Sequence, residues 1–184
     1  EIAERRVRQA FRVGGAYVLV NSGGTWKQQP ELLGSDAGSF DWVGGAVALT
    51  GDTAFVGAPN HSGNEGKVYV YSRTGTTWTE GSPLVASDGT SGDAHQFGGA
   101  IKTDGTTLLI GAPGPDFSST GIYAPGAAYV FSNAGGAWTE AQILQPDDSA
   151  DGDQCGFSIA LDSSTAIFGT PAANIGANLH QGAV

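Results

Sequence analysis

Short apolar segments alternate with clusters of glycine, asparagine, aspartate and serine along almost the whole chain. The apolar segments are rich in β-branched and aromatic residues, and some alternate between apolar and polar positions. Such runs between turn-forming residues are typical of β-strands. The clearest series predicts strands at residues 100–103, 107–110, 127–131 and 138–144.

The same four-strand series recurs along the chain. A glycine, a tyrosine- and valine-rich strand and then a tryptophan begin repeats at residues 15, 66 and 126, and a fourth copy begins at residue 182. Each repeat also holds a glycine-rich block, followed thirteen residues later by Gly-Ala-Pro or a near copy. The glycine pairs with this constant spacing are Gly44 and Gly57, Gly98 and Gly111, and Gly156 and Gly169. Four-stranded repeats of about 50 residues have the size of β-propeller blades.

The repeat divides the chain into two parts. Residues 15–184 are expected to form an all-β propeller segment, with about three blades' worth of strands. Residues 1–14 do not fit the repeat. Ala3, Val7 and Ala10 share one face of a helix there, which predicts a short helix or a linker.

The blades are not all complete within the chain. If a blade runs from the glycine-rich block to the tryptophan strand, residues 43–84 and 97–144 form two full blades. Residues 15–33 then supply two outer strands, and residues 156–184 supply an inner pair and the start of a third strand. Two interpretations stay open: half-blades of two copies complete each other, or the chain is part of a longer protein. Open sheet edges predict association in either case.

These blocks resemble the FG-GAP repeat, the blade unit of integrin-type β-propellers. The resemblance rests on Phe97-Gly98-Gly99 with Gly111-Ala112-Pro113 and on their counterparts in the other repeats. It implies a propeller of four-stranded antiparallel blades, and the Tyr-Val-Phe strand with the Gly-Gly-x-Trp turn is similar to the bacterial secreted branch. An extracellular or cell-surface location is therefore expected. The family's calcium motif is Asp-x-Asp-x-Asp-Gly in the hairpin before Gly-Ala-Pro. This motif is missing here, since that hairpin holds one carboxylate in each repeat.

Composition and charge exclude several classes of protein. The 184 residues include 30 glycines and 8 prolines, which excludes a mostly helical protein. The net charge of −10 would repel phosphate backbones, so nucleic acid is not an expected partner. No apolar stretch reaches the length of a membrane span. The single cysteine, Cys155, cannot form a disulfide within the chain and replaces Phe97 of the preceding repeat, so we expect it to be buried.

Aspartate-rich loops before each Phe-Gly block are candidate calcium sites. Only the third loop carries four carboxylates in seven residues: Asp147, Asp148, Asp151 and Asp153. Calcium requires several such oxygens converging on one point. The alternative is that these aspartates form turns by bonding nearby backbone amides.

The loops after Gly-Ala-Pro are candidate ligand-binding loops, because they are the longest and most variable stretches. They carry His61, Phe117, Tyr123 and His180. Aromatic rings can stack on sugars or peptides. The alternative is that these side chains pack on their own blades. The recurrent Trp26, Trp78 and Trp138 are expected to pack between blades.

No catalytic motif is present in the sequence: there is no nucleophile elbow, zinc-spaced His/Cys set or phosphate loop. The sequence therefore favours a non-catalytic recognition and adhesion module that binds a protein or glycan ligand and associates with itself or with further blades. Two alternatives stay open. One is a lectin-like propeller, and the other is a propeller appendage of a larger secreted enzyme.

Overall fold

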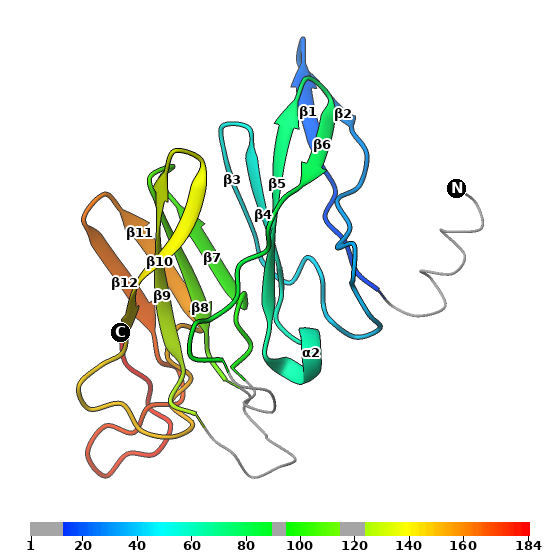
Figure 1. Cartoon of the computed structure of the whole chain (residues 1–184). Coiled ribbons are helices and arrows are strands. Elements are labelled where there is room, and N and C mark those ends of the chain that lie inside the picture. Colours follow the sequence, from blue (N-terminus) through cyan, green and yellow to red (C-terminus); the bar gives the residue numbers. More distant parts are fainter. Residues whose placement is uncertain (1–12, 90–94, 115–123) are drawn as a thin grey trace.

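The computed structural model describes residues 13–89, 95–114 and 124–184. Within them, the chain forms four antiparallel β-sheets that stand side by side in sequence order (Figure 1). A two-stranded sheet at each end, called the head hairpin and the tail hairpin, flanks two four-stranded blades. The head hairpin is β1 (Leu19–Ser22) and β2 (Thr25–Gln28), and the tail hairpin is β11 (Ser158–Asp162) and β12 (Thr165–Gly169).

Each blade is an antiparallel meander. Blade 1 consists of β3 (Val47–Thr50), β4 (Thr53–Ala58), β5 (Lys67–Thr74) and β6 (Thr77–Glu80), in that spatial order. Blade 2 consists of β7 (Ala100–Thr103), β8 (Thr107–Ala112), β9 (Ala127–Ala134) and β10 (Ala137–Leu144). All four strands predicted in blade 2 are present, and the all-β fold of partial propeller blades is confirmed. The helix predicted for the N-terminal segment falls on residues 1–12, which lie outside the described residues.

The thirteen-residue glycine spacing follows from the register of the first hairpin of each blade. The amide of Gly44 donates to the carbonyl of Gly57 at 2.9 Å, and the amide of Gly98 donates to that of Gly111 at 3.1 Å. The glycine-rich block and the Gly-Ala-Pro block of a blade therefore face each other across one hairpin. Their separation is constant because an insertion in either strand would break the pairing.

The glycines of both motifs also lie where neighbouring blades touch. A side chain at Gly57 would overlap the carbonyl oxygen of Gly98, which belongs to the next blade, and one at Gly111 would overlap that of Gly156. Two backbones in such close contact leave no room for a Cβ atom. The Phe-Gly and Gly-Ala-Pro blocks are thus the contact between successive blades.

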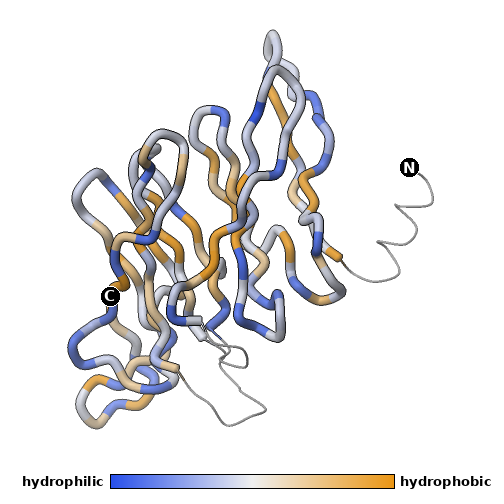
Figure 2. Tube along the Cα trace, viewed as in Figure 1, coloured by the Kyte–Doolittle hydropathy of each residue, from blue (hydrophilic) through white to orange (hydrophobic). Residues whose placement is uncertain are grey.

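The hydrophobic core lies in two layers between the sheets, and β4 supplies both. Ala54 and Val56 point into the layer shared with the head hairpin, which also holds Tyr69. Phe55 points into the layer shared with blade 2, where it joins Phe97. Successive residues of a strand face opposite sides, so a strand between two layers is apolar throughout. Figure 2 shows these apolar strands, with hydrophilic residues concentrated in turns and loops.

The prediction that the recurrent tryptophans pack between blades is confirmed for Trp78 and Trp138 and is wrong for Trp26, and the predicted burial of Cys155 is confirmed. Trp138 of blade 2 packs edge-on against Phe55 of blade 1, with ring centroids 5.2 Å apart. Trp78 of blade 1 donates its indole N–H to Gln29 Oε1, just after the head hairpin, at 2.9 Å. These two tryptophans therefore join neighbouring sheets, whereas Trp26 of the head hairpin is exposed. Cys155 is completely buried, and burial raises the pKa of its thiol to about 11.

Both ends of the stack expose positions that are buried in its middle. Val47 is 59% exposed, whereas Ile101, its equivalent in blade 2, is 5% exposed. At the other end, Ile167 is 50% exposed, and its equivalent Leu109 is fully buried. The difference arises because blade 2, which holds Ile101 and Leu109, has blade 1 on one side and the tail hairpin on the other. The two ends of the stack therefore present unfilled blade-to-blade surfaces.

Among the described residues, no helix is long and apolar enough to cross a membrane.

Candidate functional site

The loops that carry most of the predicted site residues gather at one end of the blades. In Figure 1 this end is the lower one, and the tight hairpin turns lie at the upper end. The loop end contains the short helical turn α2 (His61–Asn64), the aspartate loops and the segment after β12. We call it the loop face.

The first aspartate loop is tied to blade 1 by two adjacent contacts. Tyr69 of β5 donates its hydroxyl to Asp36 Oδ1 at 2.7 Å. Ser35 donates its amide and its hydroxyl to the Glu80 carboxylate of β6, at 3.0 and 2.8 Å. We call this combination of a Ser–Glu and an Asp–Tyr contact the loop latch.

Blade 2 has the same loop latch. Tyr129 of β9 donates to Asp88 Oδ1 at 2.8 Å, and Ser87 donates through its amide and its hydroxyl to Glu140 of β10. The structure therefore gives Asp36 and Asp88, the first aspartate of each of these two loops, a structural partner in the blade that follows. Sequence reasoning missed these tyrosine partners, although the Ser-Asp pair and the strand tyrosine both recur in the sequence.

The loop latch shifts the acidity of its members. Burial and the neighbouring carboxylate raise the pKa of Tyr69 and of Tyr129 far above the usual value, so both stay protonated hydrogen-bond donors. The Lys67 ammonium and the Tyr69 hydroxyl both bond to Asp36 and lower the pKa of that carboxyl. At neutral pH, Asp36 is therefore an acceptor, and the bonds are charge-assisted.

Blade 1 adds a charged cluster around Lys67. The Lys67 Nζ atom lies 2.6 Å from Asp36 Oδ2, and Lys67 is only 8% exposed. The predicted ligand residue His61 places Nδ1 2.8 Å from Asp41 Oδ2 and Nε2 3.9 Å from Asp36 Oδ2. In blade 2 the position of Lys67 is occupied by Ala127. His61 thus points into the protein and holds two parts of the aspartate loop.

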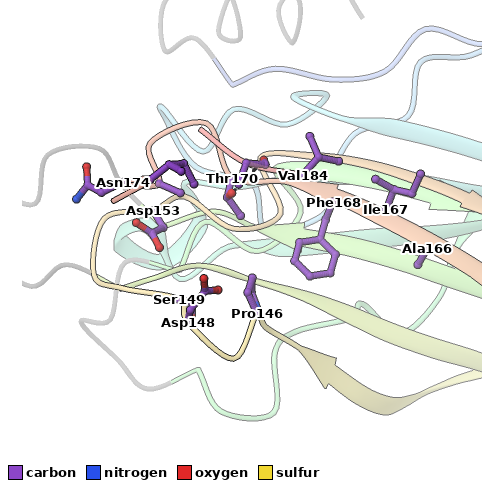
Figure 3. A pocket seen from close by; sticks show the side chains of 13 residues that line it. Pro146, Asp148, Ser149, Asp153, Ala166, Ile167, Phe168, Thr170, Asn174 and Val184 are labelled. Carbon is purple, nitrogen blue, oxygen red and sulfur yellow. Dashed lines mark hydrogen bonds between the residues drawn. The ribbon is translucent and has the colours of Figure 1, made fainter. Parts of the chain in front are cut away.

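The third aspartate loop lies beside a cavity of about 640 Å³ next to β12. Asp148, Asp153 and Asn174 line its loop side, and Phe168 and Ile167 line its strand side (Figure 3). Asp153 is buried and accepts the Ala150 amide at 2.8 Å. This contact repeats the one that Asp41 makes with Gly38 in the first loop, at 2.7 Å. Asp153 therefore forms a turn, as the alternative interpretation of these loops expected.

The calcium prediction concerns the four carboxylates of this third loop, Asp147, Asp148, Asp151 and Asp153. Asp147, Asp148 and Asp151 are exposed. In the described part of the chain, no three or more His, Cys, Asp or Glu side chains come together in a way that could hold a metal ion. The calcium site stays a prediction without geometric support.

Of the four predicted ligand residues, the structure describes His61 and His180, which lie in different parts of the stack. His180 is exposed in the segment after β12, where its amide donates to Asn174 Oδ1 at 2.8 Å, whereas His61 belongs to blade 1. Phe117 and Tyr123 lie outside the described residues.

Phe40 and Trp42 were not among the predicted site residues, yet both are exposed on the first aspartate loop. Each is 63% exposed, and their φ angles are +71° and +58°. Positive φ is rare for a bulky residue and costs about 1–3 kcal/mol. Asp41 stands between them and compensates for this strain, because it accepts from Gly38 and His61 through its side chain and from the Asn60 amide through its carbonyl. The aromatic character of the loop was visible in the sequence, but its backbone conformation was not.

The comparison with known families agrees with this geometry. A family model described as the FG-GAP repeat matches residues 26–71, 78–131 and 138–184. The chain belongs to the FG-GAP repeat family. No curated protein matches it. The three matches contain the three glycine-rich blocks and the strands that follow them, so the resemblance seen in the sequence is confirmed.

Proposed function

We propose that this FG-GAP chain is a non-catalytic recognition and adhesion module that acts outside the cell or at its surface. FG-GAP repeats are typical of extracellular proteins, and their propellers are typically non-catalytic. The ligand, a protein or a glycan, binds at the loop face. The exposed Phe40 and Trp42 on a loop held from beneath by Asp41 and His61 carry this proposal.

The loop combines two properties of a recognition surface. Exposed aromatic rings supply apolar area that is ordered before the ligand arrives, which lowers the entropic cost of binding. Asp36 lies on the same loop with a side chain that is 57% exposed, so its carboxylate can also accept hydrogen bonds from a ligand. His61 acts in this proposal as a positioning residue, and Phe117, Tyr123 and His180 are proposed as further ligand contacts.

A lectin-like activity is the second candidate. Aromatic faces next to a carboxylate are suited to a sugar ring, whose C–H faces stack on the aromatic ring while its hydroxyls donate to the acid. Attachment of the propeller to a larger secreted enzyme remains compatible with either ligand. Self-association that completes a ring is also part of the proposed function, and its geometry is developed in the next subsection.

A glycan array and a panel of immobilised extracellular proteins would test the proposal, each probed with the labelled chain. We expect binding to one class and a loss of at least about tenfold in affinity on Phe40→Ala or Trp42→Ala, because interface aromatics carry much of the binding energy. Trp26→Ala is the matched control, because Trp26 is 64% exposed but lies in the head hairpin away from this loop. Binding that survives both loop substitutions would refute the assignment of this loop.

Calcium binding at the third loop is a separate proposal, in which Asp147, Asp148 and Asp151 supply the accessible carboxylates. Isothermal titration of the chain with calcium would test it. A chain with Asp147→Ser and Asp148→Asn should then lose the binding heat. Titration of the unchanged chain without any heat would end the proposal.

A further inference from the structure

The free edge of β12 is the position of a missing third strand. In blade 1, Val56 of β4 pairs with Tyr69 of β5, and in blade 2, Ile110 of β8 pairs with Tyr129 of β9. Phe168 is the equivalent residue of β12, and within residues 13–89, 95–114 and 124–184 it pairs only with Ile159 of β11. The 640 Å³ cavity lies beside this edge, between Phe168 and Asp148 (Figure 3). We call the edge and the cavity together the strand socket.

Asp148 occupies the place in this socket that Asp36 and Asp88 occupy in the blades. Each of the three aspartates is the third residue of a four-residue turn. The amide of the fourth residue donates to the carbonyl of the first. The donors are Ala37, Gly89 and Ser149. In the first two turns the aspartate accepts from a strand tyrosine, so the socket presents a carboxylate that lacks the tyrosine found in both complete blades.

The head hairpin carries the complementary element. Ala16 pairs with Leu32 as Val68 pairs with Leu84, which makes Tyr17 the equivalent of Tyr69. Tyr17 is 64% exposed, whereas Tyr69 and Tyr129 are buried. A second cavity of about 400 Å³ is lined by Tyr17, Leu19 and Val47. It lies where the two inner strands that the head hairpin lacks would stand in a complete blade.

The Ser–Glu contact of the loop latch has different residues at the two ends of the chain. Glu80 and Glu140 stand two residues after the blade tryptophans, and Gln28 stands two residues after Trp26. On the loop side, Ser35 and Ser87 are replaced by Asp147. A glutamate opposite Asp147 would repel it, whereas the amide of a glutamine can donate to it. The two ends thus match each other in charge as well as in shape.

We propose that the strand socket takes the head hairpin of a second copy of this chain, by addition of a strand to the β12 edge. The incoming strand pairs Tyr17 with Phe168, Val18 with Ile167 and Leu19 with Ala166, in the register of the complete blades. Tyr17 then donates to Asp148, and Gln28 donates to Asp147.

The proposed contact closes on itself with two copies. The described residues form two full blades and two half-blades, so two copies of this stack joined head to tail at both ends complete six blades. Ala183 now pairs with Thr170 and holds the place that Gly15 of the incoming strand would take. The incoming strand therefore displaces Ala183 and Val184, which is 93% exposed. Gly15 can then make the backbone hydrogen bonds to Thr170 that Ala183 makes in the free chain. This inference deepens the self-association named in the proposed function and is independent of any ligand at the loop face.

Sedimentation velocity on the 184-residue chain at increasing protein concentration tests the proposal, with three variants. We expect a reversible dimer of twice 18.6 kDa. Gln28→Glu should weaken it at least about tenfold by placing a carboxylate against Asp147. Asp147→Ser in the Gln28→Glu chain should restore association, because it recreates the Ser–Glu contact of the blades. Thr76→Glu in the exposed turn between β5 and β6 is the control with the same charge change, and it should leave the dimer unchanged.

The outcomes separate this contact from others. A chain that stays monomeric at every concentration overturns the proposal and indicates that other blades fill the socket. A dimer whose affinity is unchanged by Gln28→Glu associates through another surface, and this result overturns the proposal. The proposal is also overturned if Asp147→Ser does not restore association in the Gln28→Glu chain. A failed ligand screen bears on the loop face alone and leaves this result standing.

Discussion

Three buried tyrosine hydroxyls allow a test of the loop latch with one kind of substitution. Tyr69 and Tyr129 each donate to an aspartate, whereas the Tyr71 hydroxyl is buried with no hydrogen-bond partner among the described residues. All three side chains are at most 3% exposed. Replacement by phenylalanine removes a single oxygen atom at each site and leaves the ring packing in place. The differences among the three variants therefore measure the hydrogen bond.

The expected magnitudes follow from these contacts. A hydrogen bond to a charged group contributes about 1.5–3 kcal/mol, and the 57% exposure of Asp36 places Tyr69→Phe at the low end, about 1.5 kcal/mol. Tyr129→Phe should cost a similar amount. Tyr71→Phe removes an unpaired buried hydroxyl and should be neutral or stabilise the protein by up to about 1 kcal/mol. Tyr69→Phe and Tyr71→Phe should therefore differ by at least about 1.5 kcal/mol in the free energy of unfolding.

Urea unfolding followed by tryptophan fluorescence measures these differences, and thermal unfolding should show shifts of about 2–4 °C per kcal/mol for a chain of this size. The Asp36→Asn chain supplies a second check, because Tyr69→Phe should cost less in that background. If Tyr71→Phe destabilises the protein as much as Tyr69→Phe does, the loop latch is not a source of stability and the reasoning is wrong.

Three further predictions concern pH, a glycine and the cysteine. Because the folded-state pKa of Asp36 is lowered, its stabilising contribution is present above pH 3.8 and is lost as pH falls further. The free energy of unfolding should drop in that range, and less so after Asp36→Asn. Gly111→Ala should cost more than about 3 kcal/mol, because the Cβ atom would overlap the Gly156 carbonyl, whereas Gly75→Ala meets no neighbour and should cost about 1 kcal/mol. Cys155 should not react with a thiol reagent at pH 8 until the protein unfolds, because its thiol is buried with a pKa of about 11.

Each of these predictions has a result that contradicts it. Equal acid sensitivity of the unchanged and Asp36→Asn chains would remove Asp36 from the pH dependence. Similar stabilities of Gly111→Ala and Gly75→Ala would mean that the blades can move apart at this contact. Rapid labelling of Cys155 in the native protein would show that the contact between blade 2 and the tail hairpin, where Cys155 lies beside Gly126, opens readily.

The sequence by itself determined the strands, the repeat and the family. These features depend on local chemistry: apolar residues alternate along a strand, turn residues end it, and a hairpin keeps its two glycines thirteen residues apart. The division into two full and two half-blades could also be predicted, because every strand pairs with its neighbour in the sequence. Trp78 and Trp138 could be assigned to blade contacts because the repeat placed them at equal positions.

Only the tertiary structure decided which distant residues meet. Asp36 and Tyr69 are 33 residues apart, and Ser35 and Glu80 are 45 residues apart. Their contacts exist because each of the first two aspartate loops folds against the outer strands of the next blade, a relation that strand patterns do not encode. In the same way, the pattern of the first loop did not disclose that Phe40 adopts a positive φ and stays exposed. Local interactions are legible in a sequence, whereas contacts between loops and blades depend on how the blades stack.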